Sequence, residues 1–169
     1  MPHPPAVSTP SLPVDTRPYF LEQIDDAAVV QLYADGFANL SLRDKTLTWH
    51  LYLAAIAGRD IYYDQRYAHN LAMRDILEAV LRHPSGVDDA ALREIRRYAK
   101  LFWINSGPYN NLTARKFALN LDRGAFARAV QAALDQGAAL PLAPGETAQE
   151  LVKPYAPMFF DLSFQPRIT

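Results

Sequence analysis

The fold of this chain follows from a helical pattern that is clearest at residues 70–82, NLAMRDILEAVLR. Apolar side chains recur there at spacings of three and four, and charged side chains occupy the opposite face. This period is typical of an amphipathic helix with one buried face. The pattern predicts a helix that begins near His69 or Asn70 and ends at Pro84-Ser85-Gly86.

Four further segments are expected to be helical, because they begin at good capping residues and end at glycine. Ser41 and Asp44 form a start like a capping box, and Gly58 closes that helix. Its leucines and tryptophan also alternate as in a strand, but the cap, the length and the closing glycine favour a helix. The four segments cover residues 25–36, 41–58, 88–107 and 122–137.

The placement of the 13 prolines divides the chain. Six precede residue 20 and five follow residue 140, and proline disfavours regular structure around it. We therefore expect a Pro-rich flexible arm at residues 1–19, a helical domain at 20–140 and a Pro-rich tail at 141–169. Residues after Asp161 alternate like a strand without a partner strand. The predicted fold class is mainly α, a helical bundle with irregular Pro-rich ends.

Charge and composition exclude several classes of function. The 169 residues carry 17 basic and 18 acidic side chains, for a net charge of −1, whereas nucleic-acid and anionic-membrane binders normally show a basic excess. No apolar run is long enough to span a membrane, and the N-terminus does not resemble a signal peptide, so we expect a cytoplasmic protein. The absence of cysteine excludes disulfides, thiolate metal sites and a cysteine nucleophile.

The sequence contains no complete set of catalytic residues. None of the four histidines (His3, His50, His69 and His83) has a neighbouring glutamate or a second histidine at the spacing of a helical zinc site. There is no Gly-rich phosphate loop and no nucleophile elbow. We predict no catalytic residue and no metal ligand in this chain.

Two segments are unusually polar for a structural bundle. Residues 58–67, GRDIYYDQRY, combine three tyrosines with two aspartates and two arginines. They form either a charge-paired joint that orients two helices, which we prefer, or a rim that faces a ligand. Residues 103–113, WINSGPYNNLT, display amides, a hydroxyl and an aromatic ring after a helix end. Such groups can pair with a peptide backbone, although an Asn-rich turn that satisfies its own backbone is the simpler interpretation.

The same two segments carry a resemblance to a known family. The runs FANLSLRDK (37–45), AGRDIYYDQ (57–65), HNL (69–71) and YAKLFWINSGPY (98–109), followed by Lys116-Phe117, resemble the N-terminal region of bacterial dipeptidyl peptidase III. The match is ordered, spans roughly residues 20–120 and covers only the first part of that family's chain.

The resemblance implies a zinc exopeptidase that removes N-terminal dipeptides from short peptides in a cleft between two lobes. Zinc in the complete enzyme is held by a His-Glu-x-x-Gly-His-type motif and a further glutamate, and this chain contains neither. The chain would be part of the substrate-side lobe, inactive alone and without a cofactor of its own. It would be a truncated reading frame, a split gene product or a deliberate fragment. Its partners would be short peptides and the missing remainder of the peptidase.

The family's cleft-lining loop precedes the Lys-Phe pair, so the resemblance also implies substrate-binding residues. It implicates Asn111, Leu112 and Thr113 directly, with support from Asn105, Gly107, Tyr109 and Asn110. Relatives can have an aromatic residue followed by glycine where this chain has Leu112 and Thr113. The alternative function is a free-standing helical module that binds peptides or a protein partner through this loop.

Overall fold

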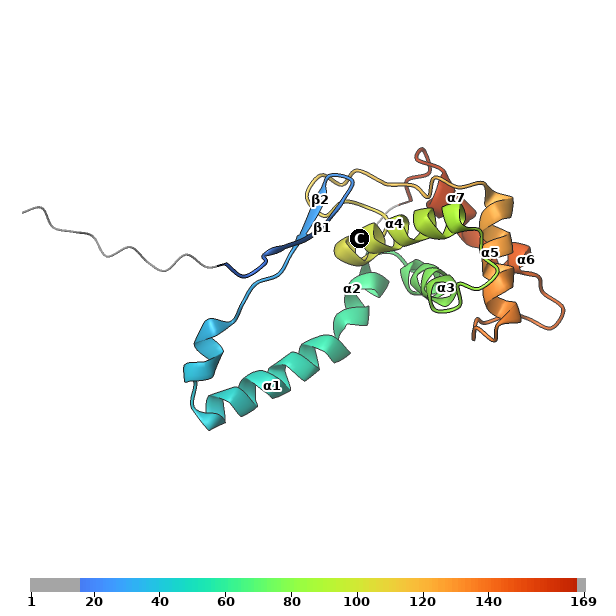
Figure 1. Ribbon diagram of the computed structural model, residues 1–169. Helices are drawn as coiled ribbons and strands as arrows, with labels where there is room; N and C mark the ends of the chain where they lie inside the picture. Colours follow the sequence, from blue (N-terminus) through green and yellow to red (C-terminus); the bar gives the residue numbers. More distant parts are fainter. Residues whose placement is uncertain (1–15, 167–169) are drawn as a thin grey trace, which may run out of the picture. The chain divides into compact units, whose positions relative to one another are not determined.

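The computed structural model describes residues 16–166 and is mainly helical (Figure 1). The chain divides into two compact units, one up to Asp35 and one from Gly36 onward. The elements are β1 (Phe20–Ile24), β2 (Ala27–Val30), the 3-10 helix η1 (Asp35–Asn39), α1 (Leu42–Ala57), α2 (Arg59–Arg66), α3 (Asn70–Arg82), α4 (Asp89–Asn105), α5 (Arg123–Asp135), α6 (Ala148–Val152), the 3-10 helix η2 (Lys153–Tyr155) and α7 (Ala156–Phe160). Across this part of the chain, no helix has the length and apolar character needed to cross a membrane.

The first unit contains a β-hairpin where the sequence predicted a helix. Strands β1 and β2 pair antiparallel, with Ile24 opposite Ala27. Asp25 adopts a left-handed backbone conformation at φ 52°, which aspartate tolerates in tight turns. The helix expected over residues 25–36 is therefore wrong, because the Asp25-Asp26 pair forms a turn rather than a helix start. Residues 1–15 of the predicted flexible arm lie outside the residues that the structure describes.

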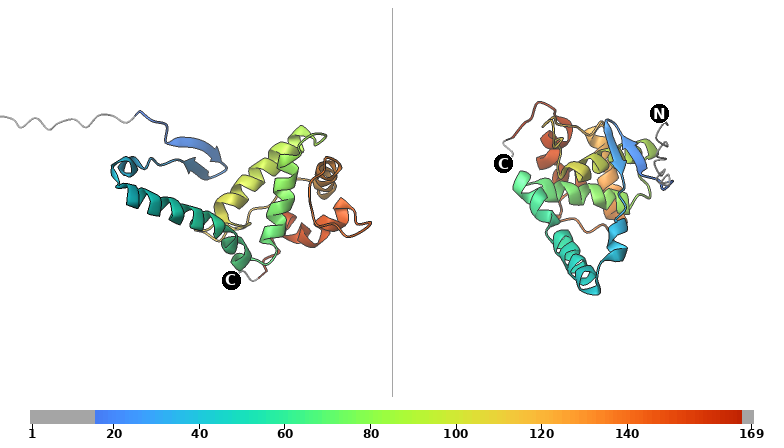
Figure 2. Two further views of the ribbon diagram at one scale, coloured as in Figure 1. Left: turned by 90° about the horizontal axis from the view of Figure 1, so that it is seen from below. Right: turned by 90° about the vertical axis from the view of Figure 1, so that its left-hand side faces the viewer.

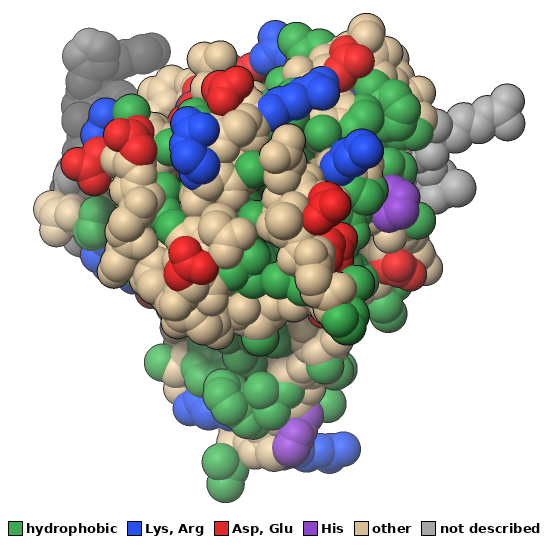
Figure 3. Space-filling model, turned by 90° about the vertical axis from the view of Figure 1, so that its right-hand side faces the viewer, with side chains coloured by type: hydrophobic (Ala, Val, Ile, Leu, Met, Phe, Trp, Pro, Cys, Tyr) green, Lys and Arg blue, Asp and Glu red, His purple; other side chains and the backbone are tan. Residues whose placement is uncertain are grey.

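Helix α1 agrees with its predicted bounds. The Ser41 side chain accepts a hydrogen bond from the Asp44 backbone N–H at 3.2 Å, and the Gly58 N–H closes the other end on the Ala54 carbonyl. None of its residues is buried. Seven large hydrophobic side chains of α1 are exposed, namely Leu42, Leu47, Trp49, Leu51, Tyr52, Leu53 and Ile56. Figure 3 shows hydrophobic side chains gathered on the lower part of the face that it draws. An apolar helix normally buries at least one face.

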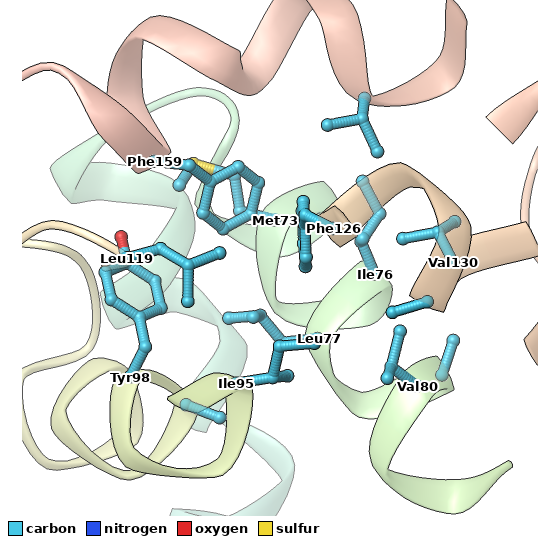
Figure 4. Packing of buried hydrophobic residues seen from close by; sticks show 14 of the residues in the cluster. Met73, Ile76, Leu77, Val80, Ile95, Tyr98, Leu119, Phe126, Val130 and Phe159 are labelled. Carbon is cyan, nitrogen blue, oxygen red and sulfur yellow. The ribbon is translucent and has the colours of Figure 1, made fainter. Parts of the chain in front are cut away.

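Helices α3, α4 and α5 form the core of the second unit, as Figure 2 shows from two sides. The predicted apolar stripe of α3 is fully buried at Met73, Leu77 and Val80. It packs against Ile95 and Tyr98 of α4 and against Phe126 and Val130 of α5 (Figure 4). Asp88 and Asp122 cap the starts of α4 and α5 by accepting backbone N–H bonds. All three predicted helices are confirmed.

The C-terminal segment is more regular than its prolines suggested. It forms α6, η2 and α7, and both Pro154 and Pro157 lie in the first turn of a short helix. Proline is compatible with that position because the first turn has no hydrogen bond to lose. Phe159 is fully buried against Tyr98 and Phe126. The strand expected after Asp161 does not form, because these residues make a turn in which Asp161 accepts from Ser163.

A charge pair joins helices α2 and α3. This agrees with the preferred interpretation of the polar segment at residues 58–67 as a charge-paired joint. The Arg74 guanidinium donates to the Asp60 carboxylate at 2.6 Å, and the Arg74 side chain is only 11% exposed. Tyr63 lies under the guanidinium and stacks on Phe102. The hydrogen bond from Arg74, followed by its charge, holds the pKa of Asp60 below its usual value.

We expect Asp60→Asn to reduce the loss of folding stability that occurs at acid pH. A carboxyl with a lowered pKa in the folded state stabilises the fold above its unfolded pKa, and this stabilisation is lost as pH falls through the folded pKa. The melting temperature of the variant should thus fall less than that of the wild type between about pH 4 and pH 2. Asp64→Asn is the control, since no ion-pair partner of Asp64 lies within residues 16–166. Equal acid dependence in wild type and Asp60→Asn would contradict this role.

Candidate functional site

Helix α4 ends in an unusual backbone turn. Ser106 adopts a left-handed conformation at φ 51°, and Gly107 follows at φ 146°. The Gly107 N–H returns to the Phe102 carbonyl at 3.0 Å and ends the helix. A Cβ on Gly107 would lie 2.9 Å from Nδ2 of Asn70. Glycine is needed here for both its backbone conformation and this close approach.

Asn70, the first residue of α3, ties the ends of α2 and α4 together. Its Nδ2 donates to the Tyr63 carbonyl at 3.1 Å and to the Ser106 carbonyl at 3.4 Å. The side chain is 1% exposed. Because both amide protons are committed to carbonyls, the orientation of the amide is fixed. Its Oδ1 has no hydrogen-bond partner within the described chain.

The loop after α4 is shaped by two asparagine side chains. The Asn110 Oδ1 accepts from the backbone N–H groups of Leu112 and Thr113, both at 2.9 Å, which is an Asx-type turn. The Asn105 Oδ1 accepts from the Asn111 N–H at 3.0 Å, and its Nδ2 donates back to the Leu101 carbonyl. The self-satisfied turn that the composition suggested is therefore present.

Arg66, in the last turn of α2, completes the site. Its Nη1 donates to the Asn105 carbonyl at 2.5 Å and to the Oδ1 of Asn111. The side chain is half-buried, yet no carboxylate within residues 16–166 forms an ion pair with it. Buried or half-buried charges are normally paired. A guanidinium that contacts only neutral acceptors is therefore notable.

These elements enclose a pocket of about 180 Å³. Its lining residues are Arg66, Asn70, Ser106, Gly107, Pro108, Tyr109, Asn110, Asn111 and Ala114. Four of the residues expected at a substrate site (Gly107, Tyr109, Asn110 and Asn111) line it together. Asn105 is not among the lining residues, but its carbonyl accepts from Arg66 and its Oδ1 accepts from the Asn111 N–H. Leu112, which is 96% exposed, and Thr113 form the outer turn and are not among the lining residues.

The sequence did not predict Arg66 and Asn70 at this site. Arg66 belongs to the polar run at residues 58–67, for which a ligand-facing rim was the less favoured interpretation, and Asn70 belongs to the run HNL (69–71) of the family resemblance. Arg66 and Asn111 are far apart in sequence, and only the packing of α2 beside the end of α4 brings them together.

Tyr109 lines the pocket, but its hydroxyl oxygen is buried. Burial, with a smaller contribution from the nearby Tyr67, raises the pKa of the Tyr109 phenol. The hydroxyl is thus protonated at neutral pH and has no hydrogen-bond partner in the described part of the chain. It can donate or accept a hydrogen bond.

A larger cavity of about 480 Å³ lies beside α5 and α6, and its polar lining residues are Arg123, Thr147, Gln149, Glu150 and Lys153. The Glu150 carboxylate accepts from the backbone N–H and the hydroxyl of Thr147, so it forms a capping box at the start of α6. The Arg123 guanidinium lies 5.7 Å from the centre of the Phe160 ring. The smaller pocket is the better candidate, because four of the residues expected at a substrate site line it.

No group of three metal-ligating side chains comes together within residues 16–166. No protein-family model matches the chain, and no curated protein is significantly similar to it.

Proposed function

We propose that this chain binds short peptides at the pocket formed by Arg66 and the Asn105–Asn111 loop, as the substrate-side part of a dipeptidyl peptidase III-like zinc peptidase. One observation carries the proposal: four of the seven loop residues expected from the sequence line a single pocket, and a guanidinium that has no ionic partner within residues 16–166 completes it. A free-standing peptide- or protein-binding module is the alternative, and it uses the same groups.

The chemistry of the pocket suits an extended peptide. A peptide backbone presents carbonyl acceptors and N–H donors in alternation. The pocket offers side-chain donors on Arg66, Asn110 and Asn111. Its volume of about 180 Å³ is small, compared with several hundred Å³ for sites that enclose a drug-sized ligand. It therefore suits one residue of a peptide whose remainder lies outside.

The test is the binding of a fluorescein-labelled tetra-alanine peptide to the purified full chain, followed by fluorescence polarisation. Replacing both Asn110 and Asn111 with alanine removes two side chains of the pocket wall, so we expect the affinity to fall by about tenfold, equivalent to about 1.4 kcal/mol. The control is Asn120→Ala, an exposed asparagine on a different loop, which should not change the affinity. Unchanged binding by the double variant, with an unchanged far-UV circular dichroism spectrum, would remove the pocket from the proposal.

We further expect the chain alone, with added zinc, to release no chromophore from a chromogenic dipeptide substrate. Turnover at enzymatic rates would contradict the role of a substrate-side part.

The reading frame downstream of codon 169 then separates the two functions. A continuation that encodes a His-Glu-x-x-Gly-His-type motif supports the peptidase, and unrelated sequence supports the free-standing module.

A further inference from the structure

Some of the polar groups that line the pocket already have hydrogen-bond partners, and others do not. The Oδ1 atoms of Asn110 and Asn111 are occupied, the first by two backbone N–H groups and the second by Arg66. Their Nδ2 groups have no partner within residues 16–166. The Nε and Nη2 of Arg66 are likewise without a described partner. The capacity that remains is thus dominated by N–H donors and carries one positive charge.

We propose that the pocket binds a carboxylate group, with the Arg66 guanidinium as its counter-ion and the amides of Asn110 and Asn111 as further donors. This inference rests on the proposed function, because it takes the carboxylate to be part of a short peptide. A carboxylate only accepts hydrogen bonds when ionised, so it matches the donors that the loop leaves free. Arginine is also the side chain whose fork of donors suits a carboxylate.

The structural role of Arg66 does not account for all of its donors. Its Nη1 caps the Asn105 carbonyl at the end of α4, where a cation is favourable to the helix dipole. That contact and the contact with Asn111 use one nitrogen of the three. The remaining two nitrogens belong to a side chain that lines the pocket. Arg66 can therefore hold the loop and bind a ligand at the same time.

Two sources can supply the carboxylate, namely the C-terminus of a peptide and an acidic side chain. Two matched pairs of N-acetylated peptides distinguish them. The first pair is N-acetyl-Ala-Ala and its C-terminal amide, and the second is N-acetyl-Asp-Ala amide and N-acetyl-Asn-Ala amide. Dissociation constants are measured by ¹H–¹⁵N NMR titration of the full chain, with the side-chain resonances of Arg66, Asn110 and Asn111 as reporters.

We expect the acid of at least one pair to bind about tenfold more tightly than its amide, with shifts at the three reporter side chains. Preference in the first pair alone identifies a C-terminus, and preference in the second pair alone identifies an acidic side chain. Equal affinity of acid and amide in both pairs would overturn the inference and leave peptide binding intact. If N-acetylalanine binds and neither peptide pair does, peptide binding fails while the carboxylate site stands. If none of these probes binds, both fail.

Asn111→Asp tests the site without removing the loop contact. The aspartate keeps an oxygen beside Arg66 and supplies the missing counter-ion from within the chain. We expect the affinity for the preferred acid to fall by about tenfold or more, with no loss of thermal stability. Gln149→Glu changes the net charge equally on an exposed residue outside this pocket and should leave the affinity unchanged. Undiminished acid binding by Asn111→Asp would overturn the inference.

A second variant, Arg66→Met, replaces the arginine with an uncharged side chain of similar length. It should lose the preference for acid over amide, whereas Arg93→Met, on the exposed face of α4, should retain it. An Arg66→Met protein that is folded by circular dichroism and still prefers the acid would contradict the assignment of the counter-ion.

Discussion

Replacing Phe159 with alanine is expected to lower the free energy of unfolding by about 4 kcal/mol. The ring is fully buried, and its centroid lies 5.1 Å from that of Phe126 and 5.7 Å from that of Tyr98. Truncation removes apolar area from the core and leaves a cavity between α4, α5 and α7 that these neighbours cannot fill. Urea unfolding of the wild type and the variant measures the difference.

Leu162→Ala is the matched control for Phe159, since it lies three residues away and is 56% exposed. Its effect should stay within about 0.5 kcal/mol. If Phe159→Ala were no more destabilising than Leu162→Ala, the C-terminal segment would not be part of the core.

Lys116→Met is expected to destabilise the chain by about 3 kcal/mol. The Lys116 ammonium donates to the carbonyls of Pro157, Asp161 and Phe164 at 3.1, 2.6 and 2.9 Å. Methionine fills similar space but leaves these acceptors without their donor. Burial also lowers the pKa of Lys116. Part of the gain from three charge-assisted bonds is therefore offset by lost hydration.

The control for this variant is Lys153→Met, which makes the same chemical change at an exposed position of η2. Thermal and urea unfolding should place it within about 0.5 kcal/mol of the wild type. Equal effects at the two lysines would show that the three carbonyl contacts do not stabilise the fold.

The helices that could be predicted are those with a local signal. For α3, α4 and α5 the apolar period is regular, and Asp88 and Asp122 mark the starts of two of them. The hairpin was missed because two adjacent aspartates favour a helix start and a turn alike. Only the pairing of β1 with β2 decides between the two. The prolines misled for a related reason, since Pro157 belongs to the first turn of a helix.

The residues of the candidate site also differ in how far they could be predicted from the sequence. The loop from Gly107 to Asn111 was implicated by the family resemblance, whereas its composition alone favoured a turn that satisfies its own backbone. Arg66 and Asn70 could not be assigned, because their role depends on how α2 and α3 meet the end of α4. A charge without a counter-ion is also a property of the packed structure, and the sequence shows only that charges of both signs are present.

The exposure of α1 affects how the unfolding of this chain should be measured. A helix that buries none of its residues gains little from tertiary packing, so it should lose its structure under milder conditions than the bundle of α3, α4 and α5. Unfolding then has two stages rather than a single all-or-none transition. The signal of Trp49, within α1, reports the first stage. The signal of Trp103, within α4, reports the second, and the second is the transition in which the stabilities of core variants are comparable.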